Sequence, residues 1–108
     1  MTVEQFAKEF GYEVLCMPHP ERSINGGYAG DLLSWVMGKL EEDSAWVTIM
    51  SNVNIVAVAC LADPACIILS ENVSPDDGVV ERALQQGVNI LCSPNTTFEV
   101  CTDVAAVL

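Results

Sequence analysis

One local pattern occurs three times in the second half of the chain, and it constrains the fold more than any other feature. Each copy has a short apolar or β-branched run, a small polar loop and a segment with helical character; the runs are residues 45–50, 66–69 and 88–92. Such an order builds a parallel sheet covered by helices, and right-handed crossovers place the three loops at one edge of it. We therefore expect a three-layer α/β/α fold with a mainly parallel sheet of four to five strands.

The polar loops that follow the three runs form the expected site, because open α/β sheets bind ligands outside the carboxyl ends of their strands. Each loop also directs unpaired helix N–H groups to this edge. An alternative is that these residues only cap helices and make turns, as Ser, Asn and Thr often do. The candidate ligand-binding residues are Ser51, Asn52, Asn54, Ser70, Asn72, Ser93, Asn95, Thr96 and Thr97.

Length and charge limit the class of protein. With 108 residues we expect one domain, residues 1–108. Fifteen acidic and four basic residues give a formal charge of −11, which argues against nucleic acid and anionic membranes as partners. No apolar stretch reaches the roughly 20 residues of a membrane span, and residues 1–15 lack a hydrophobic signal region, so we expect a cytoplasmic protein.

The hydrophobic fraction of 51% is high for a small domain. A sheet buried on both faces and a subunit interface would both use these residues, so we expect a homodimer. The five cysteines lie in or beside apolar segments, form no Cys-x-x-Cys motif and accompany a single histidine, His19. We expect them to be reduced core residues, and we expect no metal, no cofactor and no catalytic residues.

Local signals predict the other elements. Residues 3–10 form an amphipathic helix with Thr2 as cap, and a second helix covers residues 31–40. Ser74 is the expected N-cap of the fourth helix, with Pro75 as its first helical residue, and the last helix is expected to begin at Thr96 with Glu99 in a capping box. The glycine cluster lacks a Gly-Lys-Ser/Thr ending, so it predicts close approach of the backbone to a neighbour; its members are Gly26, Gly27 and Gly30.

Residues 55–61 are apolar without a clear period, so two structures are possible. A hairpin with residues 46–50 is one, and a buried helix is the other. Asp63 and Pro64 would stop a helix before the next strand, and the neighbouring units are β-then-α. We therefore predict a helix.

The order of elements and three motifs resemble the DRTGG domain family, which is related in fold to the N-terminal domain of bacterial HPr kinase/phosphorylase. The motifs are GGYAGDLLS at 26–34, SPD at 74–76 and SPNTTFE at 93–99, and the resemblance covers essentially the whole chain. It implies a three-layer fold, a helix over residues 54–61, and a role as an accessory or regulatory domain beside an enzyme. Relatives occur in certain pyrophosphatases with nucleotide-sensing domains and in phosphotransacetylases.

The chain departs from the pattern that gives the family its name. Where relatives commonly show Asp-Arg-x-Asp, this sequence has Ser-Asn-Val-Asn at 51–54, and where they have a glycine pair it has Ser-Glu-Asn at 70–72. The threonine is kept, as Thr97 or as Thr96 one position earlier. The resemblance thus implies an uncharged, hydrogen-bonding version of the same edge.

Three hypotheses for function follow. The first is a non-catalytic regulatory or ligand-sensing module that forms a homodimer, binds a small polar ligand, and acts beside an enzyme or signalling partner. The second is a small free-standing enzyme of phosphoryl or acyl transfer, with Thr97 or Ser93 as nucleophile. The third is a protein-interaction subunit that binds its partner through Trp35, Trp46 or exposed valines.

Overall fold

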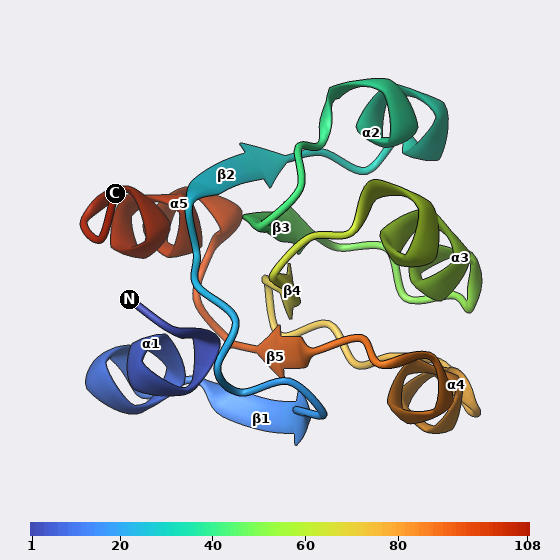
Figure 1. Cartoon of the computed structure of the whole chain (residues 1–108), viewed down its shortest axis with the longest axis horizontal. Coiled ribbons are helices and arrows are strands. Elements are labelled where there is room, and N and C mark those ends of the chain that lie inside the picture. Colours follow the sequence, from blue (N-terminus) through green and yellow to red (C-terminus); the bar gives the residue numbers. More distant parts are fainter.

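A computed structural model describes residues 1–108 and shows a five-stranded sheet between two layers of helices (Figure 1). The strand order is β1-β5-β4-β3-β2. The elements are α1 (Val3–Phe10), β1 (Glu13–Cys16), β2 (Gly26–Ala29), α2 (Leu33–Lys39), β3 (Ser44–Thr48), α3 (Asn54–Ala62), β4 (Cys66–Leu69), α4 (Val79–Gln86), β5 (Ile90–Cys92) and α5 (Thr97–Ala105).

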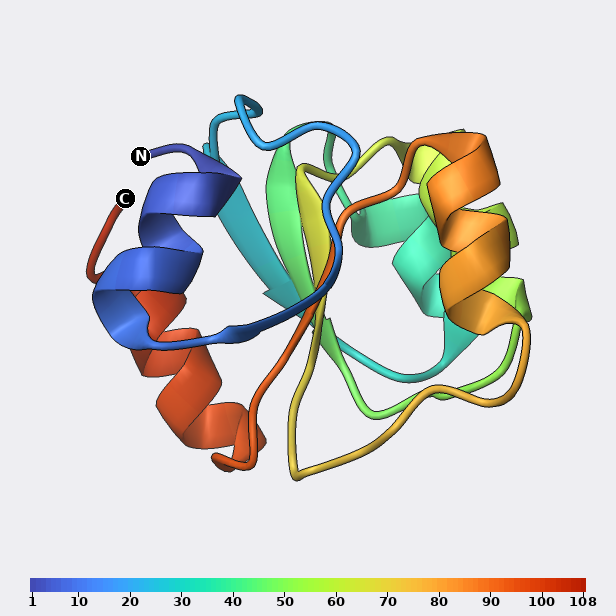
Figure 2. The ribbon, with the colours of Figure 1, turned by 90° about the horizontal axis from the view of Figure 1, so that it is seen from below.

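The sheet is mainly parallel. Strands β2, β3, β4 and β5 run in one direction, and only β1 pairs antiparallel, with β5. Figure 2 shows α1 and α5 on one side of the sheet and α2, α3 and α4 on the other. The predicted three-layer α/β/α architecture is confirmed. None of the helices is both long enough and apolar enough to cross a membrane.

The ambiguous segment after β3 is a helix, α3, as predicted. Strands β3 and β4 are parallel neighbours, so the chain must cross from the carboxyl end of β3 to the opposite edge of the sheet, where β4 begins. A hairpin turn joins antiparallel strands and cannot make this connection. The helix buries Ile55, Val56, Val58 and Ala59 against the sheet. It ends at Asp63, which has a left-handed backbone with φ 57°.

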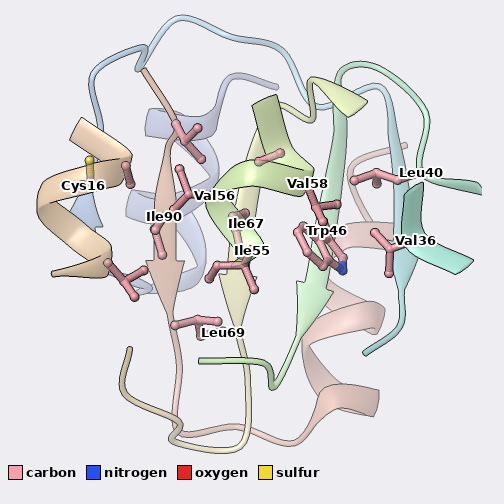
Figure 3. Packing of buried hydrophobic residues seen from close by; sticks show 14 residues of the cluster. Cys16, Val36, Leu40, Trp46, Ile55, Val56, Val58, Ile67, Leu69 and Ile90 are labelled. Carbon is pink, nitrogen blue, oxygen red and sulfur yellow. The ribbon is translucent and has the colours of Figure 1, made fainter. Parts of the chain in front are cut away.

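Two apolar cores use the surplus of hydrophobic residues, one on each face of the sheet. All residues of β3 and β4 are buried, so alternate side chains of these strands enter opposite cores. Trp46, Ile67 and Ile90 face α2, α3 and α4 (Figure 3). On the other face, Ile68 and Leu91 belong to the core that α1 and α5 cover.

The predicted caps at Thr2 and Thr96 are both present, and each forms a capping box. At α1 the Thr2 hydroxyl accepts a bond from the Gln5 N–H, and the Gln5 side chain accepts one from the Thr2 N–H. Thr96 and Glu99 make the same exchange at the start of α5. These signals are local in sequence, which is why they could be recognised without the fold.

Helix α4 begins later than predicted, and Ser74 does not cap it. The first helical residue is Val79, after Gly78 with φ 87°. The Asp76 N–H donates to the Ser51 carbonyl at 2.9 Å, so residues 74–78 span to the neighbouring loop. A contact between loops that are distant in sequence therefore overrides the local start signal.

Helix α2 is also shorter than predicted, because it begins at Leu33 and has no side-chain cap. Its buried face is narrower than its apolar stripe suggests. Val36 and Leu40 are buried, whereas Leu32 and Met37 are 59% and 50% exposed.

Arg22 stabilises the edge of the sheet at which the parallel strands begin. The Arg22 guanidinium pairs with Asp43 at 2.6 Å and with Asp63 at 2.7 Å, and it donates to the Asp63 carbonyl at 3.0 Å. Asp43 directly precedes β3, Asp63 directly follows α3, and both have left-handed backbones. Arg22 thus ties the loop before β2 to two turns of the parallel sheet.

Replacing Arg22 by Gln should lower the free energy of unfolding by about 2 kcal/mol, because charge-assisted hydrogen bonds to two carboxylates are lost. Urea unfolding followed by circular dichroism would measure the change. The matched control is Arg82→Gln, which removes the same charge from an exposed side chain on α4 that forms no ion pair. It should change stability by less than about 0.5 kcal/mol. Equal effects of the two variants would show that the bonds of Arg22 to the two carboxylates do not stabilise the fold.

Candidate functional site at the carboxyl edge of the sheet

The loops that leave β2, β3, β4 and β5 meet at one edge, which we call the rim: residues 30–32, 49–53, 70–78 and 93–96. They run along the lower edge of the molecule in Figure 2. Backbone hydrogen bonds link neighbouring loops. The Glu71 N–H donates to the Asn95 carbonyl at 2.7 Å, and the Asn72 N–H donates to the Ser93 carbonyl at 3.1 Å. With the Asp76–Ser51 bond, these contacts make the rim continuous.

The loop after β2 is attached to the rim by Asp31. One oxygen of its carboxylate accepts from the Thr48 hydroxyl at 2.8 Å and from the Ile49 N–H at 2.9 Å. Next to it, the Trp46 indole donates to the Gly30 carbonyl at 3.0 Å. Trp46 is fully buried, so the expectation that it binds a partner is wrong. Trp35, in contrast, is 59% exposed.

Several of the predicted site side chains satisfy one another. The Ser70 and Thr97 hydroxyls are 2.7 Å apart, and the Ser93 hydroxyl accepts from the Asn95 N–H at 3.1 Å. These bonds order the turns and the start of α5, which leaves the groups less free for a ligand. The side chains engaged in this way are Asn52, Ser70, Ser93, Thr96 and Thr97.

The other predicted side chains form no hydrogen bond within the chain. Asn54, Asn72 and Asn95 are exposed, and Ser51 is half-buried. Their amide and hydroxyl groups can donate and accept, so they are the part of the predicted site that is free to meet a ligand. Ser51, Asn72 and Asn95 lie in three successive loops of the rim, and Asn54 is the first residue of α3.

A hollow of about 140 Å³ lies at the β1 end of the rim. It is smaller than the roughly 300–1,000 Å³ of pockets that enclose drug-sized ligands. Among the predicted site residues only Asn72 and Ser93 line it. The complete lining is Gly11, Glu13, Asn72, Val73, Ser74, Cys92, Ser93 and Pro94.

Cys92 in this hollow is a hydrogen-bond donor. Its thiol lies 2.9 Å from a carboxylate oxygen of Glu13. Burial and this neighbouring carboxylate raise the pKa of Cys92 to about 12, because both disfavour the thiolate. At neutral pH the thiol is therefore protonated and is a poor nucleophile.

Glu71 is the rim residue that sequence reasoning missed. Its carboxylate accepts the backbone N–H of Thr97 at 2.7 Å, so it lies at the positive end of α5. Its backbone is left-handed with φ 59°, and Asn72 follows with φ 60°. A signal was present, because Glu71 is the only carboxylate between Ser70 and Pro75.

The charge of the rim is negative. Asp31, Glu71, Asp76 and Asp77 lie in its loops, and none of the four basic residues does. Lys8, Lys39 and Arg82 are on helices, and Arg22 is at the opposite edge of the sheet. No three His, Cys, Asp or Glu side chains converge to form a metal cage.

The three glycines of the predicted close-approach cluster lie in β2 or directly after it. A Cβ on Gly27 would come within 2.9 Å of a Val104 methyl group of α5. The equivalent atom on Gly26 would meet the Ser44 hydroxyl, and that on Gly30 the Tyr28 ring, both at 2.9 Å. At Gly26 and Gly27 the strand β2 lies directly against β3 and α5, whereas at Gly30 the close neighbour is the Tyr28 ring of β2 itself.

Comparison with known proteins defines the protein family to which the chain belongs. The sequence model of the DRTGG domain family matches residues 29–107, so the chain belongs to this family. A search of curated proteins finds no match.

Among solved structures, the chain is similar to the regulatory region of a Clostridium perfringens pyrophosphatase, which consists of CBS and DRTGG domains and was solved with the activator diadenosine tetraphosphate. The TM-score is 0.72 at 10% identity, over 99% of this chain and 47% of that one. The likeness shows the same fold, and the chain spans about half the length of that regulatory region.

The left-handed turn gives a test of the family's glycine pair. Replacing Glu71 by Ala or by Gly removes the same carboxylate, but only Gly adopts φ 59° without steric cost. The Gly variant should be more stable than the Ala variant by about 1 kcal/mol in urea unfolding. At the exposed position Glu81 within α4 the order should reverse, because Gly is about 1 kcal/mol worse than Ala in a helix. The same order at both positions would contradict strain at residue 71.

The capping box of α5 should appear in the pH dependence of stability. Hydrogen bonds from the Thr96 backbone N–H and hydroxyl hold the pKa of Glu99 below its usual range. A lowered folded-state pKa means that the charged form stabilises the fold above the unfolded-state pKa, and that this contribution is lost as pH falls through the folded-state pKa. The difference in unfolding free energy between wild type and Glu99→Gln should therefore shrink in acid. A difference that stays constant with pH would contradict this assignment.

Proposed function

We propose that the chain is a non-catalytic regulatory module that works as a homodimer beside a separate enzyme. Membership of the DRTGG family is the observation that carries this proposal. The similar solved structure is itself a regulatory region, and it belongs to a pyrophosphatase. The enzyme that this chain regulates would lie on another domain or another chain.

The module is proposed to occupy residues 1–108 as one domain. The family match begins at residue 29, after α1 and β1. Nevertheless β1 pairs with β5, and Phe6 of α1 belongs to the same core as Val100 of α5. The elements outside the match therefore share the sheet and core with those inside it.

The chemistry of the rim supports regulation over catalysis. Thr97 and Ser93, the nucleophile candidates of the enzyme hypothesis, have no basic side chain beside them: the Thr97 hydroxyl pairs with Ser70. The only histidine, His19, bonds through its backbone to Asn89, which directly precedes β5 at the opposite edge of the sheet. Activation of a hydroxyl nucleophile requires a base that it can bond to; the Glu71 carboxylate beside Thr97 is bonded to the Thr97 backbone N–H, and neither hydroxyl forms a hydrogen bond to a base.

The rim favours a small polar ligand without negative charge. Its free groups are amides and a hydroxyl, and its charged groups are carboxylates. A polyphosphate such as the activator of the pyrophosphatase would meet like charges at this edge and no cation to neutralise it. We therefore expect the ligand to be an uncharged or cationic polar molecule.

A protein-interaction role is the second candidate, and one observation favours it. Apolar side chains are exposed on α2 and on the adjoining rim loops, where a protein partner could bury them. They are Leu32, Trp35, Met37, Ile49 and Val53.

Thermal unfolding in the presence of a ligand panel tests the sensing role. Adenosine, free amino acids, polyamines, ATP and diadenosine tetraphosphate cover uncharged, cationic and anionic classes. We expect an uncharged or cationic compound to raise the melting temperature by several degrees, and the polyphosphates to leave it unchanged. The rise should disappear in Asn72→Ala and Asn95→Ala and remain in Gln85→Ala, which removes an exposed amide from α4.

Three results would count against the proposal. A rise that survives both rim substitutions would place the ligand elsewhere. Stabilisation by polyphosphates alone would contradict the expected ligand class. Turnover by the purified chain in phosphatase, esterase or kinase assays, lost on Thr97→Ala, would favour the enzyme hypothesis.

A further inference from the structure

The two edge strands of the sheet differ in their protection against pairing. Strand β1 at one edge carries the exposed Glu13, and its register with β5 shifts between Val14 and Cys16. A charge and an irregularity of this kind prevent another strand from adding to an edge. Strand β2 lies at the other edge (Figure 1) and has neither protection. It contains no charged residue and no proline, and its register with β3 is continuous.

The backbone of β2 has hydrogen-bonding groups that point away from the sheet. The Gly30 N–H donates to the Val47 carbonyl, so alternate residues of this strand, Tyr28 included, direct their backbone groups to β3. Gly27 and Ala29 then direct their N–H and C=O groups outward. Both residues are exposed. Their outward groups form a two-residue template for an extended partner.

The surface beside this edge is apolar and uncharged. A groove of about 170 Å³ runs between β2 and α5. In a chain with a net charge of −11, none of the residues that line this strip is Asp or Glu. The lining residues are Gly27, Tyr28, Ala29, Val47, Cys101, Val104, Ala105 and Leu108.

We propose that β2 is the dimer interface: it pairs antiparallel with β2 of a second copy about a two-fold axis at Tyr28. Gly27 of each copy exchanges both backbone hydrogen bonds with Ala29 of the other, and the two sheets join into one. This inference rests on the homodimer of the proposed function and names its surface.

The second copy fits this edge for reasons of charge and size. Two chains that each carry −11 repel one another, and an interface lined by no Asp or Glu side chain keeps that repulsion small. Gly27 and Ala29 are small residues, so the two strands can approach closely, and the groove between β2 and α5 of each copy then lies beside the other copy. Leu108, which is 63% exposed, lies at that groove. The short strand pair thus gains apolar burial from both grooves.

Sedimentation velocity over a range of concentrations tests the pairing. The wild type should be a dimer, and Ala29→Lys and Ala29→Glu should each raise the dimer dissociation constant about tenfold or more, because two like charges would lie diagonally across the new strand pair, within reach of these long side chains, and a charge on an edge strand opposes pairing. The matched control is Val14→Lys on the opposite edge, at a side chain that is 46% exposed. It adds the same charge as Ala29→Lys and should leave the dimer intact. Thermal unfolding would show whether each variant is folded.

Hydrogen exchange gives a readout that does not depend on folding of the variants. The outward amides of Gly27 and Ala29 should exchange slowly in the wild-type dimer and faster on dilution. A wild-type monomer would overturn the inference, and so would a dimer in which these amides exchange freely or that Val14→Lys breaks and Ala29→Lys does not. Protection of the same amides by an added extended peptide, in a monomeric chain, would assign the edge to a different partner and also overturn it. These measurements concern the β2 edge, whereas the ligand panel tests the rim. A failure of the β2 pairing is therefore distinguishable from a failure of the regulatory role.

Discussion

The parallel pairing of β3 with β4 is the interaction on which the rest of the structure depends. Ala45 lies opposite Cys66 and Thr48 opposite Leu69, and both strands are buried on both faces. Parallel neighbours require a crossover, so α3 must cover one face of the sheet. Because β2 and β5 extend this pairing on either side, the carboxyl ends of four strands reach one edge. The rim exists for this reason.

The rim is polar, and much of its polarity is consumed internally. Ser70, Ser93 and Thr97 hold the loops in place, and Glu71 occupies the start of α5 with a carboxylate of the chain itself. A helix start filled in this way offers little to an external anion. The groups of this edge that remain free are therefore mainly exposed amides.

Features that depend on neighbours in sequence were predictable. The capping boxes at Thr2 and Thr96, strand β4 and the termination of α3 near Asp63 follow from a few adjacent residues. The start of α4 was not predictable, because Asp76 bonds to a loop that lies far away in the sequence. For the same reason the sequence could name the rim residues but could not divide them into those that bond to one another and those that stay free.

The amino-acid sequence by itself determined the order of strands and helices, the burial of the sheet on both faces and the edge at which the polar loops meet, because each follows from local pattern and from the handedness of crossovers. Only the tertiary structure decided which side chains of that edge are engaged, that Trp46 is buried while Trp35 is exposed, and that β2 and β1 are the outer strands. Strand order and side-chain pairing join residues that are distant along the chain. Such contacts are fixed by packing in three dimensions and leave no local signature.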